Sequence, residues 1–431
     1  MQKLGEIASV KGGKRLPKGE TLTTDPNSHP YIRTKDIENH VIKTDQLEYI
    51  PDAVQKKIAR YIVDAGDLVV SIVGTVGSCA IVPAELHRAN LTENCAKILL
   101  NTEDYTTHFL YYFLRSPEGQ QEIFKNTVGS TQLKLPLYGI ENIDLPSLTV
   151  TNQKAIAHIL GTLDDKIELN QKMNQTLEEI AKAIFKSWFV DFGPVRAKAE
   201  GRPTGLPPEI SDLFPDELVD SEIGEIPKGW SVGAISDFAF LNKKNVNPSQ
   251  SSQMYEHFSI PAFDSGQSPA LDLGIDIKSN KTLVVEGSLL VSKLNPNTPR
   301  VWLPNPKELH EQICSTEFMV YTATDRSNTA YLWGLFTGSA VTKRMEAMVT
   351  GTSKSHQRVK PNDVSSINTV IPDTRLIEQY GEMVLLMLNR TLVGKSESTV
   401  ISELRNTLLP KLISGELRIP DAEKFLEEVG I

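Results

Sequence analysis

Two long stretches of the chain carry apolar residues at alternating intervals of four and three positions. One runs from Ile156 to Trp188 and the other from Leu376 to Leu408. This spacing predicts two long helices, each with one apolar seam, that form an intramolecular or partner-bound coiled coil. A single amphipathic helix on a local core is the simpler interpretation, but it does not explain two matching copies. The middle of each seam is polar, and Asn170 and Asn174 are expected to set the register of the first at a cost in stability.

The segment before each predicted helix shows a second repeated pattern, made of short apolar runs and turns. The sequences YIVDAGDLVVSIVG (61–74) and TLVVEGSLLVSKLN (282–295) both read as a turn that leads into a buried strand. The sequences NTVGSTQLKL (126–135) and AMVTGTSKSHQRV (347–359) both place glycine, serine and threonine after an amphipathic helix. The chain is therefore predicted to contain two copies of one mixed plan, each followed by a long helix.

A linker without a long helix is predicted between the two copies. Six prolines occur from Pro194 to Pro227, and residues 197–226 hold eight acidic residues against two basic ones. The fold class that follows is α+β with an internal repeat. The predicted segments are a globular domain (1–150), a helix (151–193), the acidic Pro-rich linker (194–226), a second globular domain (227–372), a second helix (373–417) and a C-terminal tail (418–431).

The composition is typical of a protein with two or three globular units. The chain has 431 residues, of which 40% are hydrophobic, and this length is too great for one hydrophobic core. No run approaches the roughly 18 apolar residues that a membrane span needs. The N-terminal segment has no apolar signal core, so we expect a soluble cytoplasmic protein. Cys79, Cys95 and Cys314 are scattered, which favours reduced thiols in the core over a zinc site.

The charge is unevenly distributed. A net charge of −9 argues against a protein that coats nucleic acid non-specifically. Residues 1–35 nevertheless carry seven Lys/Arg against three acidic residues, and residues 341–360 carry five against one. These basic stretches lie near segments rich in glycine, serine and threonine, so local binding of an anionic partner remains open.

None of the catalytic motifs that the sequence suggests is complete. Asp191-Phe192-Gly193 matches the magnesium-binding tripeptide of protein kinases, but the other kinase motifs are missing, and Gly193-Pro194 is interpreted as a helix stop. The segment SIVGTVG (71–77) lacks the Lys-Ser/Thr of a phosphate loop and is interpreted as a strand-turn-strand. We therefore predict no catalytic residue and no metal site.

DNA binding is the function class that remains when the incomplete catalytic motifs are set aside. Lys and Arg beside Ser, Thr, Asn and Gln on irregular loops are what phosphate contact and base-edge reading require. Both predicted domains contain such loops, although each alone is equally well explained as a solvated turn. The candidate DNA-binding residues are Lys11, Lys14, Arg15, Arg33, Lys35, Ser130, Thr131, Gln132, Lys134, Lys243, Lys244, Asn245, Lys293, Asn295, Arg300, Thr352, Ser353, Lys354, His356 and Arg358.

Two segments resemble a known family. The sequence LDDKIELNQKMNQTLEEIAKAIFKSWFVDFGPVRAK (163–198) closely resembles the central conserved region of the specificity subunits of type I restriction–modification systems. The sequence ISELRNTLLPKLISGEL (401–417) resembles their distal conserved region. The resemblance implies that the two α/β domains are target recognition domains and that the long helices form an antiparallel intramolecular coiled coil. No motif of the family transfers individual base contacts, because the recognition domains are its variable part.

The resemblance also implies the partners. They are double-stranded DNA, two methyltransferase (modification) subunits, and restriction subunits that move and cut DNA. S-adenosylmethionine, ATP and Mg are then expected on those partners, with no cofactor on this non-catalytic chain. The residues expected at the coiled-coil or subunit interface are Leu163, Ile167, Asn170, Asn174, Leu177, Ile184, Phe185, Trp188, Phe189, Ile401, Leu404 and Leu408.

Two other classes of protein remain as alternatives. A coiled-coil scaffold would have the same helices, but its domains would not bind DNA. A single-chain nuclease or methyltransferase would need a cofactor or metal motif that the sequence does not show.

Overall fold

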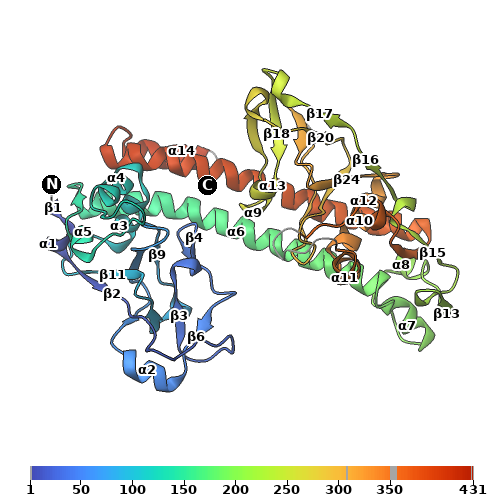
Figure 1. Cartoon of the computed structure of the whole chain (residues 1–431), viewed down its shortest axis with the longest axis horizontal. Coiled ribbons are helices and arrows are strands. Elements are labelled where there is room, and N and C mark those ends of the chain that lie inside the picture. Colours follow the sequence, from blue (N-terminus) through green and yellow to red (C-terminus); the bar gives the residue numbers. More distant parts are fainter. Residues whose placement is uncertain (1, 307–308, 350–356, 429, 431) are drawn as a thin grey trace. The chain divides into compact units, whose positions relative to one another are not determined.

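The computed structural model describes the chain apart from residues 1, 307–308, 350–356, 429 and 431. It contains two compact units, one of Met1–Ile167 with Val400–Ile431 and one of Glu168–Thr399 (Figure 1). The helices α6 (Val150–Phe189) and α13 (Thr374–Ser414) each contribute to both units. Each unit is therefore an α/β domain together with a part of both long helices.

The first unit is built around two four-stranded sheets. One has the order β2-β11-β8-β9 and is antiparallel, and the other has the order β6-β3-β10-β7 with β3 and β10 parallel. The strands are β1 (Gln2–Lys3), β2 (Ala8–Gly12), β3 (Pro30–Ile32), β4 (Ile37–Glu38), β5 (Val41–Ile42), β6 (Glu48–Tyr49), β7 (Ile62–Val63), β8 (Leu68–Ser71), β9 (Cys79–Ile81), β10 (Ala89–Leu91), β11 (Cys95–Leu100) and β12 (Asp144–Leu145). The shorter helices are α1 (Leu4–Ile7), α2 (Asp52–Ile58), α3 (Thr107–Arg115), α4 (Pro117–Lys125), α5 (Leu137–Glu141) and α14 (Ile419–Glu428).

The second unit has a four-stranded sheet of order β16-β24-β21-β22 and a five-stranded sheet of order β17-β20-β23-β18-β19. The strands are β13 (Leu218–Ser221), β14 (Gly224–Pro227), β15 (Ser231–Ala234), β16 (Ala239–Asn242), β17 (Asn245–Val246), β18 (Met254–Phe258), β19 (Ala270–Leu273), β20 (Lys281–Leu283), β21 (Ser288–Ser292), β22 (Val301–Trp302), β23 (Glu311–Cys314), β24 (Phe318–Ala323) and β25 (Asn368–Ile371). The shorter helices are α7 (Gly193–Ala199), α8 (Pro208–Ser211), α9 (Ile260–Asp264), α10 (Arg326–Thr337), α11 (Ser339–Ala347) and α12 (Pro361–Ser365).

The two units have matching topology. In each, the first long strand lies at the edge of an antiparallel sheet next to the last long strand, so β2-β11-β8-β9 corresponds to β16-β24-β21-β22. The mixed sheets correspond as well, because β3 and β10 are parallel as β18 and β23 are. A two-stranded pair, β1 with β12 or β15 with β25, precedes the long helix in both. The predicted internal repeat is confirmed.

The paired turn-strand motifs lie in the centre of these antiparallel sheets. Every residue of β8 and of β21 is buried, which is why both sequences are continuous apolar runs. Gly66 and Gly287, just before these strands, have φ of +88° and +75°, a left-handed conformation that glycine adopts without strain. The strand-turn-strand interpretation of residues 71–77 is also correct, since β8 pairs with β9 across them.

The interpretation of Gly193-Pro194 as the helix stop is wrong in detail. Helix α6 ends at Phe189, and Phe192 adopts the left-handed conformation with φ of +52°. Gly193 and Pro194 instead begin α7, because a proline in the first helical turn has no amide hydrogen to lose. The predicted acidic linker holds only α7, α8 and the β13–β14 hairpin, so no long helix occurs there.

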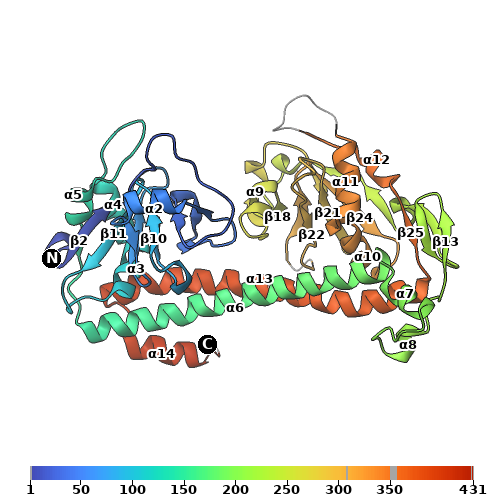
Figure 2. The ribbon, with the colours of Figure 1, turned by 90° about the horizontal axis from the view of Figure 1, so that it is seen from below.

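In the second unit, α6 and α13 run side by side and antiparallel (Figure 2). Along α6, every predicted seam position from Ile156 to Trp188 is buried or half-buried. Along α13, Leu376, Tyr380, Ile401 and Leu408 are buried as predicted, but the register of the middle differs by one position. Val384, Leu388 and Thr391 are buried, whereas the predicted Met383, Met387 and Arg390 are half-buried, because this part of α13 also contacts the domain core.

Candidate nucleic-acid interface

The basic loop of the first domain begins at a glycine that the packing requires. The Gly13 amide donates to the Cys95 carbonyl over 3.0 Å, and the Lys14 amide donates to the Leu91 carbonyl over 2.8 Å. A Cβ on Gly13 would lie 2.1 Å from the Thr92 carbonyl oxygen, so only glycine fits. The loop is thereby attached to both sheets, and Lys11 and Lys14 extend from a rigid backbone into solvent.

A cavity of about 440 Å³ lies beside this loop. It contains three cationic side chains, of which the sequence analysis singled out only Lys11. Arg60 and Lys97 were missed, because they are distant from Lys11 in the sequence and lie in none of the basic loops that the sequence analysis considered. The lining residues are Lys11, Gly12, Gly13, Arg60, Tyr61, Ile62, Leu91 and Lys97.

Several predicted DNA-binding arginines are engaged inside their own domains. Arg15 pairs with Glu93 at 2.7 Å, and Arg33 pairs with both Asp36 and Glu48. Lys35 also pairs with Glu48, at 3.2 Å. Hydrogen bonds from Arg33 and Lys35 outweigh the small effect of burial and lower the pKa of Glu48. These cations are partly neutralised, which makes Arg33, with a side chain only 22% exposed, a poor candidate for phosphate contact.

The arginines of the second domain follow the same pattern. Arg300 binds Asp264 through two nitrogens, at 2.7 and 2.9 Å. Arg358 binds Glu317 in the same way, at 3.0 and 3.1 Å. Within the described part of the chain, no carboxylate lies within 4.0 Å of the predicted lysines Lys11, Lys14, Lys134, Lys243, Lys244 and Lys293.

In the first domain, the structure brings the predicted loop 130–134 to the end of strand β8. Val128 and Lys134 bond to each other through both backbone groups, at 2.8 and 2.9 Å, and close the loop. The Leu135 amide donates to the Ile72 carbonyl over 2.9 Å, which attaches the loop to the segment after β8. Ser130, Thr131, Gln132 and Lys134 are all exposed on it.

The second domain repeats this arrangement. The Asn295 amide donates to the Gln357 carbonyl over 2.8 Å, and Val359 donates to the Lys293 carbonyl over 3.1 Å. Residues 293–295, after β21, therefore lie next to the segment around Arg358. Lys243 and Lys244 are exposed on another loop, and Asn245 is exposed at the start of β17; Lys243 donates to Asn362 over 3.1 Å. Thr352, Ser353, Lys354 and His356 lie outside the described residues.

A charged network joins α6, α13 and the first domain. Asp164 on α6 binds Arg115 at 2.8 Å, Arg405 on α13, and the Tyr112 hydroxyl at 2.9 Å. Burial alone raises the pKa of Asp164, but Arg115 and Arg405 outweigh it and hold that pKa below its usual value. The network therefore fixes this end of both helices against α3.

The predicted interface residues fall into two groups. Leu163, Asn170, Asn174, Phe185, Trp188, Phe189, Ile401 and Leu408 are buried, and Ile167, Leu177, Ile184 and Leu404 are half-buried. The aromatic end of α6, expected at the coiled-coil or the subunit interface, packs on α13. Phe185, Trp188 and Phe189 each contact the Tyr380 ring of α13, with centroids 5.1 to 6.0 Å apart. They are therefore not an exposed surface for a partner subunit.

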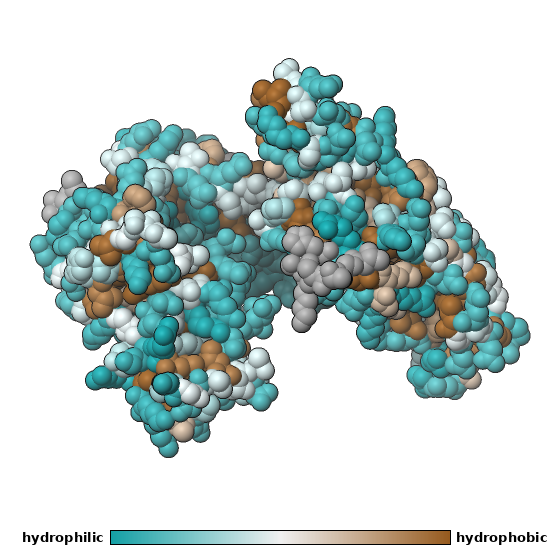
Figure 3. All heavy atoms as spheres, viewed as in Figure 1, coloured by the Kyte–Doolittle hydropathy of each residue, from teal (hydrophilic) through white to brown (hydrophobic). Residues whose placement is uncertain are grey.

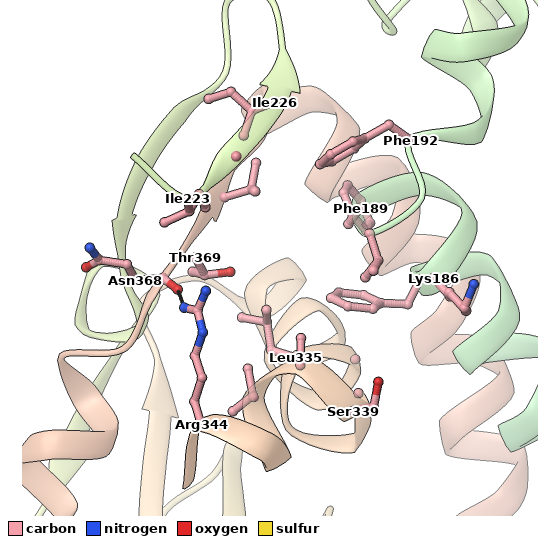
Figure 4. A pocket seen from close by; sticks show the side chains of 18 of the residues that line it. Lys186, Phe189, Phe192, Ile223, Ile226, Leu335, Ser339, Arg344, Asn368 and Thr369 are labelled. Carbon is pink, nitrogen blue, oxygen red and sulfur yellow. Dashed lines mark hydrogen bonds between the residues drawn. The ribbon is translucent and has the colours of Figure 1, made fainter. Parts of the chain in front are cut away.

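An apolar cavity of about 440 Å³ lies beside this aromatic end (Figure 4). Phe189 and Phe192 line one wall, and Ile223 and Ile226 of the linker hairpin line another. The guanidinium of Arg344 donates to the Asn368 carbonyl at the rim. No histidine or cysteine is among the described lining residues. The aromatic and aliphatic walls of this cavity suit an apolar group.

Other features narrow the candidate chemistry. Cys79, Cys95 and Cys314 are buried, and burial raises the pKa of each to about 12, so they are unreactive thiols. Among the described residues, no group of three metal-ligating side chains occurs. No helix in the described part of the chain is long and apolar enough to cross a membrane.

Comparison with known proteins gives a consistent result. Residues 1–179 match the family described as the type I restriction modification DNA specificity domain. The type I restriction enzyme HindI specificity subunit of Haemophilus influenzae is 26% identical over 458 residues, covering 91% of this chain and 96% of that protein. The MjaIX specificity subunit of Methanocaldococcus jannaschii is 22% identical over 440 residues, covering 98% of this chain and 94% of that protein.

A solved structure shares the fold. The S subunit of a type I restriction-modification system from M. genitalium aligns over 95% of both chains, with a TM-score of 0.56 and 12% sequence identity. Another protein therefore has the same architecture of two α/β domains with two long helices.

Proposed function

Because this chain is similar over nearly its whole length to type I restriction enzyme specificity subunits, we propose that it is the DNA sequence-recognition subunit of such a complex. Each domain reads one half of a bipartite DNA target. The chain directs methylation and restriction and does not catalyse either reaction.

One observation carries this proposal beyond similarity. In both domains the segment after the central strand is hydrogen-bonded to the segment that follows the amphipathic helix pair, at Ile72 with Leu135 and at Lys293 with Val359. The same construction thus brings lysine, asparagine, glutamine, serine or threonine side chains together twice. These are the groups that contact phosphates and base edges.

The loops differ between the domains, although the topology matches. The segment Ile72–Gly74 after β8 reads IVG, whereas the corresponding segment Lys293–Asn295 after β21 reads KLN. Different side chains read different bases, so the two half-sites are expected to differ and the target to be asymmetric. The long helices then set the unread gap. Helix α6, with 40 residues, extends about 60 Å, compared with about 34 Å for one turn of DNA.

The coiled coil also supplies a surface for the catalytic partners. Leu386 and Val393 of α13 are 72% and 50% exposed and stand seven residues apart, on one face of the helix. On the face drawn in Figure 3, exposed apolar side chains are scattered among hydrophilic ones. A partner helix laid along α13 would cover Leu386 and Val393. We propose two methyltransferase subunits at the coiled coil, with S-adenosylmethionine on them and ATP and Mg on restriction subunits, in the cytoplasm.

A domain exchange tests the proposed function. Replacing residues 1–150 by the first domain of another specificity subunit should change one half-site of the methylated sequence and leave the other intact. Methylation-sensitive sequencing of a host genome that expresses the hybrid gives the result directly. A change in both half-sites, or in neither, would contradict modular reading. A scaffold without DNA specificity would produce no sequence-dependent methylation pattern at all.

A further inference from the structure

The cavity beside Gly13 carries a net positive charge. Lys97 pairs with Asp67 at 3.3 Å, so its charge is balanced within the domain. Lys11 and Arg60 are both exposed, and no described carboxylate lies within 4.0 Å of either. Two uncompensated cations therefore face a space of about 440 Å³. This electrostatic environment favours an anion.

One of the two cations, Arg60, is held by an aromatic ring. The Arg60 guanidinium lies 5.1 Å from the centroid of the Tyr61 ring, and Arg60 donates to the Tyr61 hydroxyl over 3.1 Å. Lys14 places its ammonium 5.8 Å from the same centroid. The backbone at Gly13 lines the same cavity, and no side chain fits at that position. A rigid backbone beside an oriented guanidinium binds a phosphate with less loss of conformational entropy than mobile side chains do.

The second domain lacks this combination. The segment Lys281–Leu283 corresponds to Arg60–Ile62, because β20 occupies the place of β7. Lys281 is 8% exposed, and its ammonium donates to the Ser279 hydroxyl over 2.6 Å. Thr282 takes the place of Tyr61, so no aromatic ring holds a guanidinium there. Among the described residues, the second domain therefore has no counterpart of the Arg60–Tyr61 contact, although Lys243 and Lys244 are exposed nearby.

We propose that this cavity, through Lys11 and Arg60, binds one phosphate group of the DNA backbone and anchors the first domain independently of sequence. The inference rests on the proposed function and adds a division of labour to it. The cavity positions the domain, while base reading belongs to other loops, such as Ser130–Lys134.

The test compares two double variants of the full chain, assembled with its modification subunits. Lys11→Gln with Arg60→Gln removes the cavity cations. Lys56→Gln with Lys57→Gln removes the same charge from exposed positions on α2 and serves as the matched control. Equilibrium binding is measured over a salt series with the target duplex and with a scrambled duplex. Equal thermal unfolding of all three proteins establishes that the variants fold.

The cavity variant should weaken binding to both duplexes by the same factor. Its slope of log affinity against log salt should be smaller by about 1 than that of the wild type, as for one lost phosphate contact. In the wild type, a single methylphosphonate substitution at one backbone position should weaken binding, and the cavity variant should not respond to it.

Three results would overturn the proposal. The cavity variant has the same slope as the control, it loses affinity for the target duplex alone, or no methylphosphonate position distinguishes it from the wild type. Failure of the proposed function looks different, because the wild-type complex would then show no preference for any gapped target over the scrambled duplex.

Discussion

At the scale of single residues, charge pairing separates structural from available cations. The arginines that the sequence suggested as DNA contacts are bound to carboxylates in both domains, as with Arg15, Arg300 and Arg358. Arg forms planar two-point contacts with carboxylates, and Lys does not. The lysines on the same loops therefore remain the better candidates for phosphate contact, a distinction that only the positions of Glu93, Asp264 and Glu317 make visible.

Asp164 is predicted to be a main determinant of stability in the first unit. Replacing it by Asn leaves Arg115, whose side chain is 6% exposed, without its carboxylate. We expect a loss of about 2–3 kcal/mol, below the usual range for a fully buried pair because Asp164 is a quarter exposed. Denaturant unfolding measures this loss as a change in the free energy of unfolding. Asp165→Asn, at an exposed neighbouring position, should change stability little, and equal losses in both variants would contradict the role of the network.

His40 is predicted to make the first unit sensitive to mild acid. Burial, assisted by the nearby Arg115 charge, lowers its pKa from the ordinary histidine value of 6.5 to about 4. Since the folded pKa is depressed, the stabilisation is complete above pH 6.5 and is lost as the pH falls towards 4. The loss reaches about 3 kcal/mol at 1.36 kcal/mol per pH unit.

The variant His40→Gln should remove this pH dependence. Unfolding free energies measured between pH 7 and pH 4 should fall less steeply in the variant than in the wild type. His108→Gln, at an exposed position of α3, is the control and should keep the wild-type slope. Parallel slopes in all three proteins would show that His40 titrates normally in the folded state.

At the scale of elements, the polar middle of the coiled coil is closely packed rather than merely tolerated. A Cβ on Gly394 of α13 would lie 2.5 Å from the Oδ1 atom of Asn174 on α6. Asn170 donates to Glu397 over 3.2 Å, and Lys395 pairs with Glu178 at 3.0 Å. The helices approach closely at this polar part of the seam, so register there depends on a glycine opposite an asparagine.

This contact predicts a coupled pair of substitutions. Gly394→Ala should destabilise the second unit in the wild-type background, despite the higher helix propensity of alanine. On the Asn174→Ala background the same change should be neutral or stabilising, because the clash is absent. The double-mutant cycle is read from denaturant unfolding, with an expected coupling of about 1 kcal/mol or more. Additive effects would mean that the helices do not approach closely at this point.

The element boundaries show why local patterns succeed and fail. The central strands were predictable, because burial on both faces makes the whole strand apolar, as in β8 and β21. The end of α6 was not, because an aromatic cluster overrides the local stop signal. Phe189 and Phe192 both contact Trp230, and this packing holds Phe192 in a left-handed conformation. The contact partners are distant in the sequence.

At the scale of the whole molecule, the internal repeat is the basis of the proposed function. The proposed function assigns one half of the DNA target to each of two domains that have matching topology and include part of the same two helices. The gap between the half-sites should then depend on helix length alone. Residues of α6 pack against specific residues of α13, and the register of α13 is shifted near Thr391. An insertion in α6 therefore needs an insertion of the same length in α13 to keep the two apolar seams aligned.

Insertion of one heptad in both helices should widen the gap. Seven residues added after Asn170 and seven added before Glu397 should lengthen the unread spacer by about 10 Å, or roughly 3 base pairs. Both half-sites should stay unchanged in methylation-sensitive sequencing. A four-residue insertion at the same positions is the control, because it rotates the seam and should abolish sequence-dependent methylation. A heptad variant that keeps the original gap would contradict the spacer role.

The sequence alone determined the repeat, the two helices, the central strands and the absence of a long helix in the linker. Each of these depends on interactions between residues close together in the chain, and so leaves a periodic signal. The tertiary structure decided which cations are neutralised, where α13 shifts its register, and that Arg60 and Lys97 join Lys11 at one cavity. These features depend on Coulomb energies and steric contacts between residues far apart in sequence, which no local pattern records.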